Sequence, residues 1–290
     1  MRPSSCRFCH SRLELTGAVC RDSADLHVGR CTTCGLVQLD DCSHVAEQRY
    51  TAQGYWGDLE AARRRERAWN HKRLSLLCRH VRGIEDAHVL DYGSGHGGFL
   101  EAGQGVLRHL TGFDLSRSAC EAHRAAGWQS VNDLNEAPAA VEVILLFHVI
   151  EHLPAPWSHL ADLRRRFAKA KTFVIEVPNL HEALHGLFHN TAYQRNQFGA
   201  EHLYYFTPQT LRMVAEAAGF DIVVETQLQR YPLANHMGWL SDGTGGGQDR
   251  YLALDDESLN EHYERVLVEH GLADSLFVIC VPSAGGGRGS

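Results

Sequence analysis

The sequence lacks long hydrophobic runs and any excess of basic charge. No uncharged apolar stretch approaches the ~20 residues that a helix needs to cross a bilayer, and residues 1–10 contain no apolar core typical of a signal peptide. Lysine and arginine number 28 against 35 acidic residues, so the formal net charge is −7. Because proteins that grip nucleic acid usually present a basic face, this balance argues against a nucleic-acid partner. We expect a soluble, cytoplasmic protein that does not contact membranes.

Cysteine is plentiful, and its spacing is informative. Nine cysteines in a reducing compartment favour metal ligands or buried thiols over disulfides. Four of them form two C-x-x-C pairs that bracket 21 residues, an arrangement that can offer four thiolates to one zinc ion. Because four protein ligands leave no open coordination position, such a zinc would be structural. The predicted ligands are Cys6, Cys9, Cys31 and Cys34.

Other residues near the pairs qualify this prediction. Gly35 directly follows the second pair and suits the tight turn of a zinc knuckle, whereas His10 holds the same place after the first pair. Cys20, Cys42 or His44 could substitute for one ligand. We therefore predict a cysteine-rich, zinc-binding module over residues 1–45.

After this module, strand and helix patterns alternate. Short apolar runs closed by Gly or Pro predict strands, and amphipathic stretches with good helix formers predict helices. Such alternation is typical of a parallel sheet that is doubly wound, with helices on both faces. The strands are expected at 88–90, 110–113, 141–147, 172–177, 222–226 and 276–281. The helices are expected at 58–81, 99–107, 116–126, 158–168 and 207–218.

A glycine-rich loop follows the first of these strands. Gly93, Gly95 and Gly98 spell the G-x-G-x-x-G of dinucleotide-binding proteins, but Gly93, Gly95 and Gly97 equally spell G-x-G-x-G. Asp91, two residues before the first glycine, favours the second interpretation. An acid there suits a ligand that carries an ammonium and a sulfonium, whereas it would repel a pyrophosphate.

With Asp91, the loop resembles the D/E-x-G-x-G-x-G motif of class I methyltransferases, which use S-adenosylmethionine (SAM). The resemblance runs from about Tyr50 to Val281 and includes the segments 132–134 and 146–153, which are similar to segments of many such enzymes. The later segments 175–179, 201–207 and 218–220 resemble one subgroup, the small-molecule methyltransferases related to the ubiquinone-pathway O-methyltransferases. The resemblance implies a Rossmann-like sheet of seven strands. It also implies that SAM contacts Asp91, Gly93, Gly95, Gly97, Asp114, Leu115, Asp133, Leu134, Phe147 and His148.

Histidines near the end of the fourth predicted strand are candidates for catalysis. His148, Glu151 and His152 spell H-x-x-E-H, where the ubiquinone-type enzymes have E-x-x-E-H and hold a divalent cation. Because His148 replaces the first Glu, a second metal stays an open question here. Histidine also suits the deprotonation of a hydroxyl near neutral pH. The predicted catalytic residues are His148, Glu151, His152 and His202.

A second histidine motif is rejected. His181, Glu182 and His185 spell the H-E-x-x-H of metalloproteases, but they follow Pro178 at the mouth of a parallel sheet, where that motif has no place. His181, His185 and His189 could instead share a helix face that lines a substrate pocket.

The favoured function is a SAM-dependent methyltransferase that O-methylates a small molecule or sugar. An RNA methyltransferase that grips RNA with the zinc module is an alternative, although Phe147–Ile150 lacks the N/D-P-P-Y/F sequence used on exocyclic amines of bases. A non-catalytic scaffold that binds SAM and zinc is another alternative. The sequence leaves a homodimer open. Beyond the module, we expect a helical lid or linker at 46–82, a SAM-binding domain at 83–283 with substrate insertions at 180–206 and 230–272, and a flexible tail at 284–290.

Overall fold

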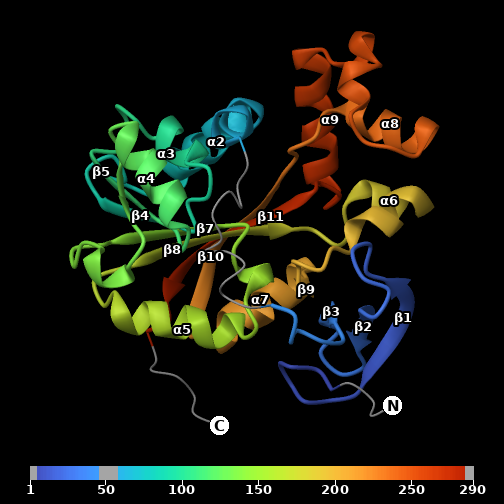
Figure 1. Cartoon of the computed structure of the whole chain (residues 1–290), viewed down its shortest axis with the longest axis horizontal. Helices are drawn as coiled ribbons and strands as arrows, with labels where there is room; N and C mark the ends of the chain where they lie inside the picture. The colour runs from blue at the N-terminus through green and yellow to red at the C-terminus, as the bar shows by residue number, and fades with distance from the viewer. Residues whose placement is uncertain (1–4, 46–57, 285–290) are drawn as a thin grey trace.

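A seven-stranded sheet forms the centre of the computed structural model, which describes residues 5–45 and 58–284 (Figure 1). Its strand order is β10-β11-β8-β7-β4-β5-β6. Strands β8, β7, β4, β5 and β6 run parallel, and β11 is antiparallel to both of its neighbours. The strands are β4 His88–Tyr92, β5 His109–Phe113, β6 Gln129–Val131, β7 Val143–Phe147, β8 Thr172–Pro178, β10 Phe220–Leu228 and β11 Ser275–Pro282.

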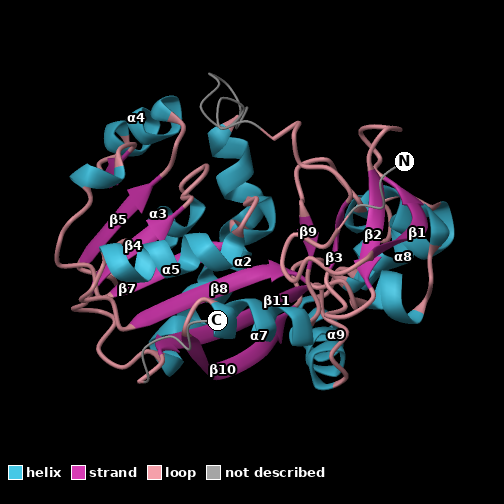
Figure 2. Ribbon diagram, turned by 90° about the horizontal axis from the view of Figure 1, so that it is seen from below, coloured by secondary structure: helices cyan, strands magenta, loops and turns pink. Residues whose placement is uncertain are grey.

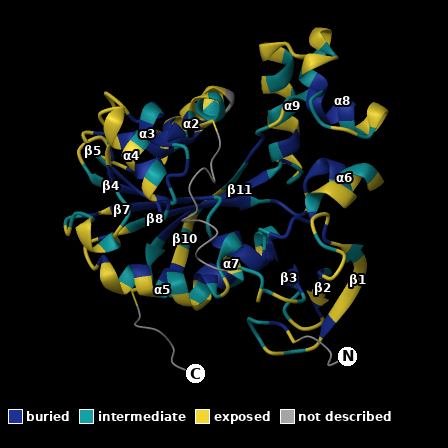
Figure 3. Cartoon of the chain, viewed as in Figure 1, coloured by how far each residue is buried: buried dark blue, intermediate teal, exposed yellow. Residues whose placement is uncertain are grey.

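Helices cover both faces of this sheet, as the apolar runs of its central strands require. Strand β7 is buried along its whole length. Its residues Ile144 and Leu146 belong to the core under α5 and α7, whereas Val143 and Leu145 belong to the core under α2 and α3. Figure 2 looks onto the face that α5 and α7 cover, and Figure 3 shows the strands buried between the two layers. The predicted doubly wound α/β fold is therefore confirmed.

The helix ends follow the expected capping rules. Asp58 accepts a hydrogen bond at the start of α2, and Ser116 does the same for α4. Thr207 begins α7 in a capping box, with Pro at the first helical position. The helices are α2 Leu59–His80, α3 Gly98–Ala102, α4 Arg117–Ala125, α5 Pro156–Arg166, α6 Thr191–Gln197, α7 Pro208–Ala217, α8 Leu233–Asp242 and α9 Glu257–Glu269.

A second sheet contains the N-terminal strands. Strands β1 Leu13–Val19, β2 His27–Cys31 and β3 Val37–Leu39 pair antiparallel, and β3 then pairs with β9 Tyr204–Tyr205. Apolar residues of the module lie in the same core as those of β9. The N-terminal module is thus attached to the rest of the chain through a shared sheet and a shared core.

Some sequence expectations fail locally. The helix expected over 99–107 ends at Ala102, because Gly103 and Gly105 continue the chain as turns. His181, His185 and His189 do not share a helix, since only His185 lies in the short helix Ala183–Leu187, and His189 has a left-handed φ of 48°. The glycines at 243–247, flexible by composition, end α8 and begin a short helix at Gly247–Asp249.

Two insertions between β8 and β11 lie beside the module at one end of the sheet (Figure 1). The first carries the short helix Ala183–Leu187, α6 and β9, and the second carries α8, α9 and the short helices Gly247–Asp249 and Leu252–Leu254. Among the helices of the described ranges, none is long and apolar enough to span a membrane.

Candidate functional site

The glycine loop lies where the strand order reverses. After β4 the chain continues to β5 and β6 on one side, whereas β7 and β8 lie on the other, and such a switch point opens a crevice at the carboxyl ends of parallel strands. Gly93 and Gly97 have left-handed φ values of 80° and 81°. A Cβ on Gly93 would lie 2.7 Å from Val149 Cγ2. Glycine is therefore required here by both conformation and space.

A cavity of about 260 Å³ opens beside this loop, and we name it the glycine-loop cavity. Asp91, Gly93, Ser94 and Gly95 line it. The Ser94 hydroxyl is buried and has no hydrogen-bond partner within the described part of the chain. Burial raises the pKa of Asp91 to about 7, since the opposing effect of Arg73 is smaller. The cavity wall thus offers a hydroxyl and a carboxylate that a polar, cationic ligand would satisfy.

Asp114 fixes the shape of the loop from the end of β5. Its carboxylate accepts hydrogen bonds from the backbone N–H groups of Gly95 and Ser116, both at 2.8 Å. The side chain is 5% exposed. These bonds join the loop after β4 to the turn after β5, so Asp114 orders the cavity wall as well as carrying a negative charge to it.

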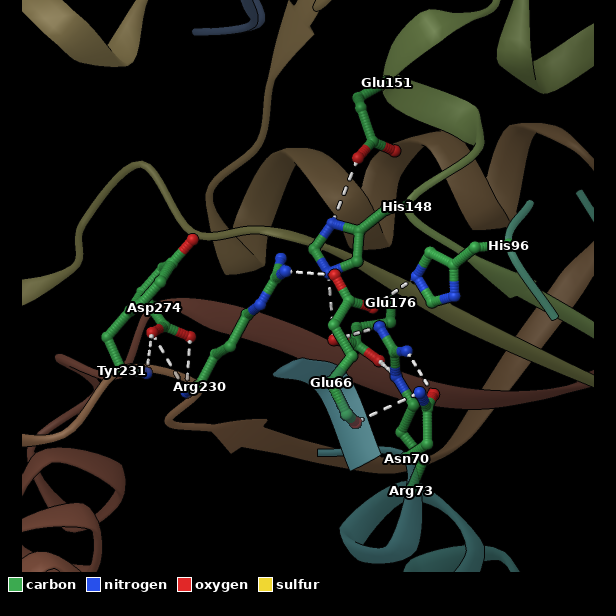
Figure 4. A network of polar contacts seen from close by, with 10 residues as sticks. All are labelled: Glu66, Asn70, Arg73, His96, His148, Glu151, Glu176, Arg230, Tyr231 and Asp274. Atoms are coloured by element: carbon green, nitrogen blue, oxygen red, sulfur yellow. Dashed lines mark hydrogen bonds and ion pairs between the residues drawn. The ribbon is translucent and has the colours of Figure 1, made fainter. Parts of the chain in front are cut away.

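A chain of alternating buried charges runs beneath the cavity (Figure 4). Arg73 of α2 contacts the Glu176 carboxylate with Nε at 2.6 Å and a second nitrogen at 3.1 Å. Glu176 also contacts His148 Nε2 at 3.1 Å, and His148 Nδ1 contacts Glu151 at 3.2 Å. Arg73, Glu176 and Glu151 are buried. Such paired arrangements make buried charges tolerable.

This chain fixes the protonation state of His148. Burial by itself would lower the pKa of His148, but the hydrogen bonds and charges of Glu151 and Glu176 outweigh it and raise the pKa to about 9. Burial likewise opposes ionisation of Glu176, yet Arg73 and His148 hold its pKa at about 2. His148 is therefore a cation near neutral pH, with both ring nitrogens donating to carboxylates.

His202 lies next to this chain and has the opposite character. Its ring meets that of His152 edge-on, with centroids 4.8 Å apart. Burial, together with the neighbouring charge of His152, lowers the pKa of His202 to about 3. His152 itself is oriented by a 2.8 Å hydrogen bond between Nδ1 and the Glu201 carbonyl. His202 is therefore neutral over the ordinary pH range.

Arg230 completes the wall on the side of the second insertion. Its guanidinium pairs with Glu66, which also contacts His96 Nε2 at 2.9 Å. Its backbone N–H donates to both oxygens of Asp274 at 3.0 Å. Burial raises the pKa of Asp274 to about 6. Arg230 is thus held in place at both its backbone and its side chain.

A second, larger cavity of about 540 Å³ lies among the insertions, and we name it the insertion cavity. Aromatic and amide side chains line much of it, including Tyr193, Asn196, Tyr231, Asn235 and Trp239. Three residues line both this cavity and the glycine-loop cavity. They are His148, His202 and Arg230.

The four predicted zinc ligands come together in the N-terminal module. Sγ atoms of Cys6 and Cys34 lie 3.7 Å apart, and those of Cys9 and Cys31 lie 3.4 Å apart. All four sulfurs lie within 4.8 Å of one another. These separations exceed a disulfide bond and approach the ~3.8 Å between sulfurs bound tetrahedrally at about 2.3 Å from zinc. The residues therefore fit a zinc ion.

The two knuckles of this module have the same backbone form. His10 N–H donates to the Cys6 carbonyl, and Gly35 N–H donates to the Cys31 carbonyl. Both residues have left-handed φ values, 61° for His10 and 75° for Gly35. His10 thus adopts the turn that glycine makes in the second knuckle.

A family model described as a methyltransferase domain matches residues 61–225, which is more than half of the chain. The protein belongs to the class I SAM-dependent methyltransferases. No curated protein matches the sequence significantly.

Solved structures share the fold of this methyltransferase. A methyltransferase complex of Haloferax volcanii that contains the activator Trm112 includes a chain with 14% identity and a TM-score of 0.54; the match covers 83% of this chain and 99% of that one. A SAM-dependent methyltransferase from Archaeoglobus fulgidus has 17% identity and a TM-score of 0.44, with 73% and 94% covered. The 1,6-didemethyltoxoflavin-N1-methyltransferase of Burkholderia thailandensis has 17% and 0.45, with 90% and 97% covered.

The structure brings many, but not all, of the predicted residues together. The predicted residues that line the glycine-loop cavity are Asp91, Gly93, Gly95, Phe147, His148, His152 and His202. Glu151 lies behind His148, and Asp114 holds the loop. Leu115 and Leu134 pack against the core, and Asp133 caps a short helix at Leu134–Glu136. All the assigned SAM contacts stay predictions, including those of Gly97, Leu115, Asp133 and Leu134, and residues 46–57 of the expected lid or linker lie outside the described residues.

Five charged residues of the site were missed from the sequence. Glu176 gave a signal, because an acid in the otherwise apolar strand 172–177 is fully buried and needs a partner. The others gave none, since their roles come from contacts between distant segments. These residues are Glu66, Arg73, Arg230 and Asp274.

Proposed function

We propose that this methyltransferase transfers a methyl group to a hydroxyl of a small, polar molecule such as a sugar. One observation carries the proposal: His148, His202 and Arg230 line both cavities. The glycine-loop cavity would hold SAM, and the insertion cavity would hold the acceptor. Both ligands would then reach the same three side chains, as an in-line transfer between two bound molecules requires.

The residues of the glycine-loop cavity fit SAM. The Asp91 carboxylate would pair with its ammonium group, and Ser94 with another polar atom. The left-handed glycines allow close approach of the backbone. Bound SAM supplies a methyl group already activated on a sulfonium. The protein's own task is therefore to orient the acceptor, exclude water and remove a proton.

His202 is the side chain best suited to take that proton. It is neutral, lines both cavities and is partly buried. A low pKa suffices for this step, because the proton of a hydroxyl becomes strongly acidic as its oxygen bonds to the methyl carbon. Its proton affinity is raised by the nearby carboxylate of Glu151. We therefore assign the proton acceptor to His202, with His152 beside it.

His148 has a different role in this proposal. A base needs a ring nitrogen that can accept a proton, but both ring nitrogens of His148 face carboxylates and its pKa is raised to about 9. We assign it the role of a fixed cation that lies between the carboxylates of Glu151 and Glu176, and bonds both, at the boundary of the two cavities.

The lining of the insertion cavity supports a hydroxylated acceptor. Aromatic faces of Tyr193, Tyr231 and Trp239 can pack against the C–H faces of a ring, and the amides of Asn196 and Asn235 can bond hydroxyls. A sugar offers both features. This cavity draws on both segments predicted as substrate insertions.

A second metal is not part of the proposal. Ligand atoms of Glu151, His152 and His202 do lie within 4.8 Å of one another. The second oxygen of Glu151 is buried without a hydrogen-bond partner in the described part of the chain, but a divalent cation there would be repelled by the imidazolium of His148, which bonds the same carboxylate. We therefore expect metal analysis of the purified protein to give one zinc per chain, and a second bound metal would revise the assignment of His202.

The module offers little support for an RNA-binding role. Arg7 and Arg21 of the module donate to carbonyls of Leu203 and Asn196, so they are used within the protein. An RNA substrate would require steeply salt-dependent binding. We expect no such binding at low salt, and finding it would favour the RNA methyltransferase.

The test of the proposed function is an acceptor screen. The protein is incubated with SAM and a panel of free and nucleotide-linked sugars, amines and carbon acids, and products are detected by the mass gain of a methyl group. We expect products only from hydroxylated acceptors, and the His202→Ala variant should lose them. If methyl groups were transferred only to amines or carbon acids, the proposal of O-methylation would be wrong.

A further inference from the structure

The first zinc knuckle contacts the methyltransferase fold through its own two intervening residues. Arg7 and Phe8 lie between the ligands Cys6 and Cys9. The ring of Phe8 meets that of Trp157 on α5 edge-on, with centroids 5.1 Å apart. Arg7 points toward β3 and β9 instead. The knuckle therefore docks on the methyltransferase fold at two points.

Arg7 makes an unusually complete set of contacts. Its backbone N–H donates to Gln38 at 3.1 Å, and its Nε donates to the Tyr204 hydroxyl at 3.0 Å. Its two terminal nitrogens donate to the carbonyls of Leu39 at 2.8 Å and Leu203 at 3.0 Å. The guanidinium also lies over the Tyr204 ring, 4.9 Å from the centroid. A planar fork with several donors is what arginine provides and lysine lacks.

The Leu203 peptide connects Arg7 to the catalytic candidates. Its carbonyl accepts from Arg7 and from Leu39 N–H, and its own N–H donates to the Glu151 carbonyl at 2.8 Å. Leu203 directly follows His202, and Glu151 bonds His148. Tyr204 continues the link, because its hydroxyl donates to the Pro154 carbonyl at 2.6 Å. One arginine thus fixes the peptide that joins the two histidine segments.

We propose that Arg7 is a positioning residue, which the four-cysteine centre holds so that the Leu203 peptide, and with it His202, stays in place at the boundary of the two cavities. This inference rests on the site described under the proposed function. It gives the zinc module a role in the enzyme itself. Loss of the metal should release the knuckle and loosen the segment that carries His202.

The test compares Arg7→Met with Arg12→Met in the full-length, zinc-loaded protein. Arg12 lies in the same module, is exposed, and shows no side-chain hydrogen bond in the described part of the chain. Amide hydrogen exchange is measured by NMR at Leu203, at Leu39 and at Cys20 of the module, whose N–H donates to the Leu26 carbonyl at 3.0 Å. Zinc content and S-adenosylhomocysteine affinity are measured alongside.

In Arg7→Met we expect exchange at Leu203 and Leu39 to become about tenfold faster or more, since two charge-assisted hydrogen bonds are lost. Exchange at Cys20, the zinc content and the ligand affinity should stay as in the wild type, and Arg12→Met should change nothing. Arg7→Lys keeps the positive charge but lacks the several planar donors of a guanidinium. It should therefore restore only part of the protection of Leu203 and Leu39 against exchange. In wild-type protein, zinc removal by a chelator should accelerate exchange at Leu203 as Arg7→Met does.

Two results would overturn the inference. One is unchanged exchange at Leu203 in Arg7→Met. The other is loss of zinc with equal acceleration at Cys20, which would mean that Arg7 only holds the module together. Because the measurement uses no acceptor, its failure would leave the assignment of His202 intact. With an acceptor in hand, Arg7→Met should lower kcat while the KM for SAM is unchanged.

Discussion

The two cavities of this methyltransferase are built in different ways. The glycine-loop cavity takes Asp91, Gly93, Ser94 and Gly95 from one continuous segment, the end of β4 and the turn that follows it. The insertion cavity takes its wall from segments far apart in the chain, from Arg21 in the module to Ser275 at the start of β11. A local sequence motif thus builds one wall of the glycine-loop cavity, whereas long-range contacts bring together its remaining lining residues and those of the insertion cavity.

The difference also extends to their charges. Below the glycine-loop cavity, charged groups are buried and paired, as in Arg73–Glu176–His148–Glu151. The insertion cavity combines charged residues, among them Arg21, Glu182 and Asp274, with aromatic and amide side chains. A family can therefore keep one cofactor site while the insertions change the acceptor.

Removing the buried acid should destabilise the wall shared by the two cavities. Glu176→Gln leaves the Arg73 guanidinium, 5% exposed, without its carboxylate. Because an uncompensated buried charge is costly, we expect the free energy of unfolding to fall by about 3–5 kcal/mol in urea denaturation. Glu101→Gln breaks the exposed pair with Arg67 and should cost less than about 1 kcal/mol. If both variants lost the same free energy of unfolding, the buried pair would contribute no more to stability than the exposed pair.

Removing the proposed proton acceptor should slow methyl transfer and leave SAM affinity nearly unchanged. We expect His202→Ala to lower kcat by about 100-fold or more, the usual contribution of general base catalysis. SAM affinity by calorimetry should change little, because His202 touches the cavity only at its boundary. His109→Ala, on an exposed residue at the start of β5, is the matched control. Full activity in His202→Ala would exclude it as the base.

Because His148 lies between two carboxylates, the free energy of unfolding should depend on pH. The pKa of His148 is raised in the folded state from its ordinary 6.5 to about 9. Its contribution is therefore fully present below pH 6.5 and is lost as the pH rises through 9. The stability difference between wild type and His148→Gln should shrink by about 3 kcal/mol over that range. A difference that stays constant from pH 6.5 to 9.5 would mean that His148 is not held as a cation.

Removing the carboxylate of Asp91 should weaken only the binding of SAM. Asp91→Asn should lower SAM affinity by about tenfold, as expected for one lost charge pair near a cavity wall. Because the pKa of Asp91 is raised to about 7, the wild-type affinity should fall as the pH drops below 7, and the variant should not follow. Asp162→Asn, exposed on α5, is the control. Equal pH profiles for wild type and Asp91→Asn would remove Asp91 from the site.

The sequence predicted what local rules dictate. Left-handed turns require glycine at Gly93 and Gly97, and tetrahedral zinc requires paired cysteines, so both motifs could be recognised in the sequence. Strand β7 could be recognised because burial on both faces leaves a purely apolar run.

Other features depend on partners that no local pattern reveals. Arg73 and Glu176 are 103 residues apart, and Arg7 and Leu203 are 196 apart. The expected base His148 became a cation because two carboxylates from different elements meet it. Strands β1, β2 and β3 are short or largely exposed, so their apolar pattern is weak. Residues such as these became visible only when the chain had folded.

The central claim is that methyl transfer occurs where the two cavities meet. A crystal structure with bound S-adenosylhomocysteine tests it most directly. The account predicts the amino group beside Asp91 and the sulfur opening onto the insertion cavity at His202. A ligand seated elsewhere, or a sulfur walled off from the insertion cavity, would contradict it.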